Sequence, residues 1–193
     1  MKTLFFLICV LFLFSQKSSA EVERIMISWN TVICDGICNQ RIRTSLLKIK
    51  PVVDVQINDT QGVANLLWDS KYPFEYEPFR FAAGEAGIRF NDMRLKVKGK
   101  IVTNDKNIFL ISDIDLARFL LIGPTKIDPY RYVVPNNIAS HPIPAQMEAQ
   151  LLNARDLNQS VLISGPLFLP RTYDRTLIIE QIQILQESTS KHR

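Results

Sequence analysis

The chain has 193 residues, of which 47% are hydrophobic and 22% are charged, and its formal net charge is +4. These values are those of an ordinary globular protein and exclude a low-complexity or fully disordered chain. The length allows one or two small domains.

The first twenty residues have the pattern of a secretory signal peptide. Lys2 supplies a positive start, Leu4–Phe14 is an uninterrupted apolar run, and Ser18-Ser19-Ala20 offers small residues for cleavage before Glu21. The run is too short to cross a bilayer comfortably, although an uncleaved anchor is the alternative. We therefore expect residues 1–20 to be removed, giving an exported protein, periplasmic or extracellular, without stable membrane insertion.

Cleavage would change both the charge and the cysteine count. Without Lys2 and Lys17 the chain carries 21 basic and 19 acidic residues, a net charge near +2. That balance gives little support to nucleic-acid binding, and no nucleic-acid partner is expected. Cys9 is also removed, which leaves Cys34 and Cys38, and an even cysteine count in an exported protein favours a disulfide.

Residues 22–92 predict a ferredoxin-like βαββαβ domain. Cys38, Ile42, Leu46 and Ile49 recur at helical spacing, whereas the flanking segments alternate apolar and polar residues as strands do. The predicted elements are a strand at 24–29, a helix at 38–49, strands at 52–57 and 63–68, a helix at 78–86 and a strand at 93–102. This order is the split βαβ arrangement.

Residues 93–186 predict a second domain, a small OB-like β-barrel. The strand at 93–102 could equally open this domain. Further strands are predicted at 107–112 and 117–122, a helix at 145–154, and strands at 160–169 and 175–185. Three strands, a helix and two strands is the order of an OB barrel, and Gly99 and Gly165 fit bulges where a sheet curls. Residues 187–193 are expected to be a disordered polar tail. The predicted class is thus α+β.

Residues 24 to about 98 resemble a heavy-metal-associated domain, the copper-chaperone-like module. In that family the second motif cysteine opens the first helix, as Cys38 opens 38–49 here. A short valine strand follows at 51–57, a strand with small and aromatic residues at 62–68, and an Ala-Gly pair at 86–87. The chain places three residues between its cysteines where the family places two, and it lacks the preceding methionine.

The resemblance implies non-catalytic binding of a soft metal, Cu(I) or Zn(II), by the thiolates of Cys34 and Cys38. The start of a helix lowers the pKa of a thiol there, which favours the metal-binding thiolate. Two other interpretations remain open. Cys34 and Cys38 form a disulfide in a structural or protein-binding module without metal, or they only pack. The expected partners are therefore a metal ion or another envelope or secreted protein.

No enzyme is predicted. The sequence contains no Gly-rich phosphate loop, no Gly-Xaa-Ser-Xaa-Gly segment and no His-Glu-Xaa-Xaa-His segment, and neither His141 nor His192 has a partner at ligand spacing. Asp113 and Asp115 are interpreted as turn residues.

An OB-like barrel also suggests oligonucleotide binding, through basic and aromatic side chains on its face. Lys96, Lys98, Phe109, Arg118 and Phe119 are the candidates. We favour the interpretation that the lysines form the solvated side of a strand and the phenylalanines belong to the core.

Overall fold

The computed structural model describes residues 22–31, 36–104, 106–113, 116–125, 141–168 and 175–185. The predicted signal segment, the predicted tail and Cys34 lie outside these residues. Within the described part, no helix has both the length and the apolar character needed to cross a membrane.

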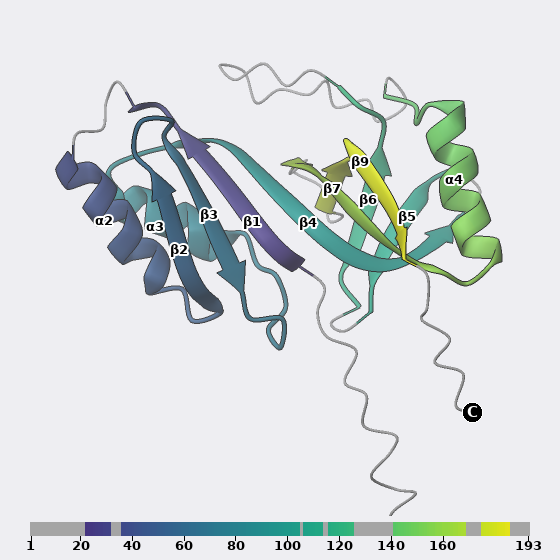
Figure 1. The fold of residues 1–193 in the computed structure, drawn as a ribbon, viewed down its shortest axis with the longest axis horizontal. Helices are drawn as coiled ribbons and strands as arrows, with labels where there is room; N and C mark the ends of the chain where they lie inside the picture. The colour runs from purple at the N-terminus through teal and green to yellow at the C-terminus, as the bar shows by residue number, and fades with distance from the viewer. Residues whose placement is uncertain are drawn as a thin grey trace, which may run out of the picture.

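The described chain is an α+β fold, a ferredoxin-like domain followed by a small closed β-barrel, as predicted (Figure 1). In chain order the elements are β1 (Val22–Trp29), α2 (Gly36–Leu47), β2 (Val52–Asn58), β3 (Val63–Trp68), α3 (Glu77–Ala86), β4 (Phe90–Thr103), β5 (Ile108–Ser112), β6 (Arg118–Ile122), α4 (Ala145–Asp156), β7 (Ser160–Phe168), β8 (Arg175–Ile178) and β9 (Gln181–Leu185).

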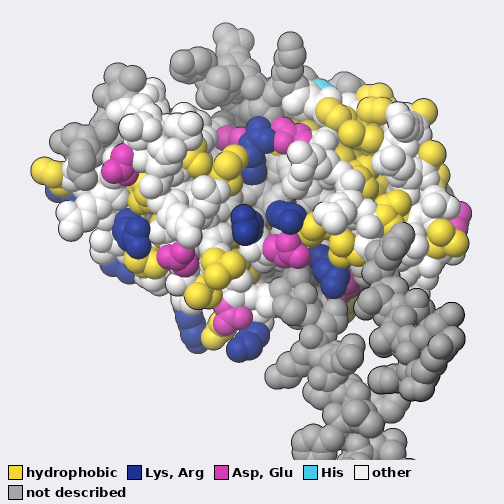
Figure 2. All heavy atoms as spheres, in the orientation of Figure 1, with side chains coloured by type: hydrophobic (Ala, Val, Ile, Leu, Met, Phe, Trp, Pro, Cys, Tyr) yellow, Lys and Arg dark blue, Asp and Glu magenta, His cyan; other side chains and the backbone are white. Residues whose placement is uncertain are grey.

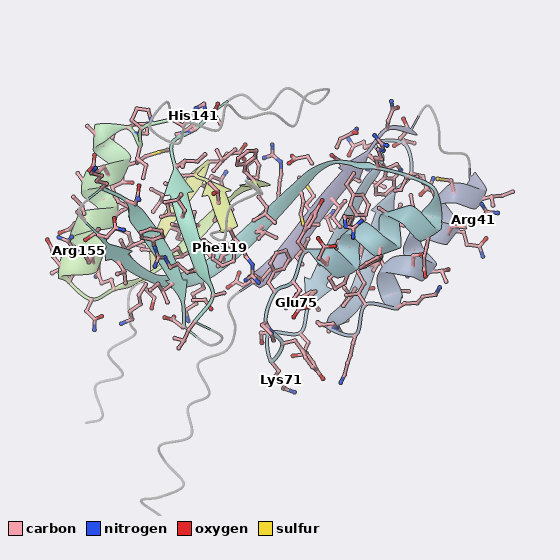
Figure 3. The ribbon with its side chains drawn as sticks, turned by 180° about the vertical axis from the view of Figure 1, so that it is seen from behind. Arg41, Lys71, Glu75, Phe119, His141 and Arg155 are labelled. Carbon is pink, nitrogen blue, oxygen red and sulfur yellow. The ribbon has the colours of Figure 1, made fainter. Side chains whose placement is uncertain are left out.

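The N-terminal domain is an antiparallel sheet in the order β2-β3-β1-β4. Alternate residues of the central strand β1, Ile25 and Ile27, are buried, as the period of a half-buried strand requires. The helices α2 and α3 pack on one face of the sheet, which Figure 3 shows from the helix side. Their buried side chains include Ile42, Leu46 and Phe79, so one core lies between the helices and the sheet.

The strand β4 belongs to both domains. Along one edge it pairs first with β1, over Phe90–Val97, and then with β5, over Gly99–Thr103, while its other edge pairs with β7 over 94–100. The boundary expected between residues 92 and 93 therefore falls inside a continuous strand. Gly99 stands where β5 takes over from β1, and a Cβ atom there would lie only 2.3 Å from the carbonyl oxygen of Ile111.

The barrel closes in the order β4-β5-β6-β8-β7, with β7 returning to β4. Only β6 and β8 among these neighbours run parallel, and α4 lies between β6 and β7 in the chain. This is the strand order of an OB barrel. The buried residues of α4 are Leu151 and Ala154, which join the same core as the sheet.

The single last strand predicted at 175–185 is wrong in one respect, because the structure divides it into β8 and β9. Both pair antiparallel with β7, but the register shifts by one residue between Leu167↔Leu177 and Ser164↔Gln181. At the break, the backbone N–H of Ile179 donates to the carbonyl oxygen of Ile122 at 3.0 Å. This bond extends the parallel ladder of β6 and β8 by one residue, and the N–H of Glu180 then donates to the carbonyl oxygen of Ser164 on β7 at 3.0 Å. The one-residue shift along β7 is the arrangement of a β-bulge.

Candidate functional site

Cys38 lies in the first turn of α2, partly buried against the main core. Its side chain is engaged by a partner and does not stand free. Cys34 and Cys9, the other two cysteines of the chain, lie outside the described residues, so the structure does not describe either of them as that partner. A disulfide sulfur is not a thiolate, and only the thiolate is the metal ligand. Metal binding at Cys34 and Cys38 therefore applies to the reduced protein.

Other ligands for a metal do not gather in the described part of the chain. There, no three His, Cys, Asp or Glu side chains come close enough together to hold an ion. The two-sulfur site expected at Cys34 and Cys38 includes a residue outside the described part of the chain and stays a prediction.

A hollow lies between the two helices of the N-terminal domain. It has two halves of about 510 and 600 Å³ that share Ser45, Lys48 and Glu85. We call it the interhelical groove. The α2 side is lined by Ile37, Gln40, Arg41, Thr44, Ser45 and Lys48, and the α3 side by Pro78, Phe81, Ala82 and Glu85. Positions on each side recur at helical spacing, so each helix presents one stripe to the groove.

Trp68 lines the groove and belongs to a packed aromatic cluster beneath it. The ring centroids of Trp68, Phe74 and Phe79 lie 5.8 to 5.9 Å apart, and all three side chains are buried. The indole N–H of Trp68 donates to the carbonyl oxygen of Tyr72 at 3.0 Å, and the N–H of Asp69 donates to that of Pro51 at 2.7 Å. These bonds hold the segment after β3 against the core, so the groove is formed before any ligand arrives.

Apolar side chains stand exposed at the rim. Phe81 and Ile37 are each 63% exposed and Tyr72 is 36% exposed. The Nζ atom of Lys50 lies 5.2 Å from the ring centroid of Tyr72, within the range of a cation–π contact. Neighbouring exposed apolar residues around a concave surface are typical of an interaction site.

The ion pair of Lys48 and Glu85 crosses the groove. The two side chains come from opposite walls, and Nζ lies 3.0 Å from Oε2. The hydrogen bond and the positive charge of Lys48 lower the pKa of the Glu85 carboxyl, with a smaller contribution from Ser45. This pair neutralises one charge of each wall, and α2 itself contains no acidic residue. Arg41, on the α2 wall and labelled in Figure 3, therefore makes this wall basic.

The barrel residues considered for oligonucleotide binding are occupied otherwise. Phe109 and Phe119 are buried, and the guanidinium carbon of Arg118 lies 3.7 Å from the ring centroid of Phe109. Lys96 pairs with Glu23 at 3.3 Å. These phenylalanine rings do not stand free for stacking on bases.

In the face that Figure 2 shows, basic and acidic side chains lie next to one another. Arg94 bonds the carboxylate of Asp92 at 2.6 Å and also pairs with Glu180. Such mixed charge is unlike the uniformly basic groove that follows a nucleic-acid backbone.

Asp113 and His141, two of the residues considered in the sequence, make hydrogen bonds within the fold. The carboxylate of Asp113, next to the end of β5, accepts a hydrogen bond from the Ser160 hydroxyl at 3.4 Å. The carbonyl oxygen of His141 accepts from the N–H of Gly123 at 3.0 Å. Asp115 and His192 lie outside the described residues.

Sequence reasoning did not identify the interhelical groove. One available signal was Phe81, which falls off the buried stripe of α3 formed by Phe79, Ala82, Ala83 and Ala86. Another was the cluster of proline and aromatic residues at 72–78, which read only as a connection.

No protein-family model, no curated protein and no solved structure matches this chain.

Proposed function

We propose that the chain is an exported, non-catalytic structural or protein-binding module, in which a Cys34–Cys38 disulfide closes the entry to α2. The observation that supports this proposal is the place of Cys38 in the first turn of the helix, packed against the core with its side chain engaged by a partner. Of the two remaining cysteines, Cys34 is four residues away in the sequence, whereas Cys9 belongs to the predicted signal segment.

The disulfide has a defined physical role in this proposal. Closing so short a loop removes conformations from the unfolded chain and stabilises the fold by about 2 kcal/mol. The closed loop leads into the N-terminus of α2, and α2 is one of the two walls of the interhelical groove. The bridge would thereby keep the groove in shape in an oxidising compartment.

Thiol counting on protein taken from its native compartment tests the proposal. We expect no reactive thiol in the folded or denatured protein until a reductant is added, and two afterwards. The Cys34→Ser, Cys38→Ser double variant should lose about 2 kcal/mol of unfolding free energy in urea. Two thiols that a chelator alone makes reactive would contradict the disulfide and support a bound metal.

A second candidate function is soft-metal binding by the reduced pair, as the heavy-metal-associated resemblance implies. It is favoured by the position of Cys38, because the positive end of the α2 dipole stabilises a thiolate and no acidic residue in the first turn opposes it. Cu(I) titration under reducing conditions should then give about one ion per chain, lost in the double serine variant. Equal uptake by that variant would exclude this function.

A further inference from the structure

We propose that the interhelical groove binds an amphipathic helix of another exported protein, one with an apolar stripe flanked by acidic residues. The inference rests on the proposed function only in taking the chain to be a binding module. It would hold whether Cys34 and Cys38 form a disulfide or bind a metal.

The groove is suited to apolar anchors. Trp68 lines the groove above an aromatic cluster, and its indole N–H donates to the carbonyl oxygen of Tyr72. The next residue, Asp69, is held by a backbone bond to Pro51. A preformed apolar pocket requires little reorganisation, which lowers the cost of binding. The exposed ring of Phe81 stands at the edge, where it would be covered by an anchor side chain.

The length of the groove matches a helix of about three turns. Its α2 wall runs from Ile37 to Lys48, which at about 1.5 Å per residue corresponds to about 16 Å. A bound helix of that length places residues i, i+3 or i+4 and i+7 toward the groove. One anchor would fill the half that Trp68 and Phe81 line, and a second would cover Ile37 in the other half, beyond the Lys48–Glu85 pair, where the rest of the lining is polar.

The charges of the groove walls determine which charged residues a bound helix should carry beside its apolar stripe. On the α2 wall and its continuation, Arg41 and Lys50 remain positive after Lys48 has paired with Glu85. On the opposite side Glu75 is the acidic residue left along the described lining. Acidic residues on the flank that faces α2 would therefore complement the groove, and basic residues there would be repelled.

Three peptides of about 14 residues test the inference. They share one leucine stripe and carry Glu, Gln or Lys on the flank. NMR signals of the full, oxidised chain are followed during each titration. We expect shifts at Ile37, Tyr72 and Phe81, with the Glu peptide binding at least about tenfold tighter than the Lys peptide.

Two pairs of variants locate the binding. Arg41→Glu should reverse the preference between the peptides, whereas Arg43→Glu, on the same helix but outside the lining, makes the same change in net charge and should leave it. Phe81→Ala should weaken the Glu peptide by about tenfold or more. Leu157→Ala, which truncates a side chain 60% exposed at the end of α4, should have no effect.

Several results would overturn the inference. They are the absence of shifts at about 1 mM peptide, equal binding of the Glu and Lys peptides, and equal effects of Arg41→Glu and Arg43→Glu. Vesicles of equal parts phosphatidylglycerol and phosphatidylcholine serve as the alternative ligand. Shifts of the groove signals with vesicles but not with peptides would identify a membrane surface instead. Thiol counts on the same sample decide the disulfide separately, so the two failures are distinguishable.

Discussion

The two domains share a strand but differ in the exposure of apolar side chains that lie outside the main core. In the ferredoxin-like domain, Ile37 and Phe81 stand exposed along a hollow. In the barrel, Phe109, Leu120 and Ile122 alternate with residues of the main core and so face the other side of the sheet, yet they are buried in a second cluster. The N-terminal domain thus leaves apolar side chains open along its hollow, whereas the barrel buries this second face of its sheet.

The shared strand β4 connects the exposed helix face to the barrel. Over 94–97, β4 is hydrogen-bonded on both edges, to β1 and to β7, and its residues Leu95 and Val97 are fully buried. A strand paired on both edges belongs to the most protected part of a fold. The open helix face is therefore mounted on a scaffold that the barrel stiffens, and we assign molecular contact to the first and support to the second.

The sharpest way to test this division compares two phenylalanines of α3. Phe79 is fully buried in the aromatic cluster, so Phe79→Ala should cost about 3 to 5 kcal/mol of unfolding free energy. Phe81 is largely exposed, so Phe81→Ala should stay within about 0.5 kcal/mol while weakening peptide binding. Urea unfolding of both variants measures this. A comparable loss in both would mean that Phe81 serves the fold and that the rim is not a separate surface.

A second comparison uses one glycine of each domain. In Gly165→Ala, the new Cβ atom would lie 1.8 Å from the carbonyl oxygen of Ile178, and opening the bulge should cost about 1 to 3 kcal/mol or more. In Gly84→Ala, within α3, the new Cβ atom would meet nothing within 4 Å apart from its chain neighbours and the backbone of its own helix. The higher helix propensity of alanine should therefore stabilise the fold by about 0.4 to 1 kcal/mol. Opposite signs in chemical unfolding are expected. The same sign in both would contradict the tight closure assigned to the barrel.

Much of the fold could be predicted from the sequence because its signals are local. Alternation identifies β4, helical spacing identifies α2, and the order of elements then restricts the topology. The division of the last strand could not be predicted in this way, because it depends on a one-residue change of register against β7, which no local pattern shows. The presence of Gly165 indicated a bulge but not which neighbouring strand would bend around it.

The candidate site was less predictable than the fold. The cysteines are visible as a pair, but the sequence leaves their chemistry open. The groove is a property of the spacing between α2 and α3, which is set by how Leu46, Phe79 and the sheet pack rather than by any one stretch. In the sequence, the residues of its walls have the pattern of ordinary solvated helix faces. Ile37 and Phe81 lie at one rim only because the two helices pack side by side in the folded chain.

The smallest expected effect concerns the ion pair across the open face. Lys48 lowers the pKa of Glu85 below its ordinary value of 4.5, so in the acid range the unfolded chain binds more protons than the folded one. The contribution to stability is complete above the unfolded pKa and is lost as the pH falls through the folded pKa. Because both side chains are more than half exposed, this contribution is small and is screened by salt.

Carboxyl NMR titration of Glu85 isolates this interaction from the rest of the acid transition. Lys48→Gln should return the pKa of Glu85 toward 4.5, and about 1 M salt should act in the same direction. Lys50→Gln is the matched control, since Lys50 lines the same hollow but lies against the ring of Tyr72 instead. If the two variants shifted Glu85 equally, its pKa would reflect the general positive charge of the α2 wall. The groove would then have no fixed division into two halves, and the spacing of the two anchors in the bound helix would lose its basis.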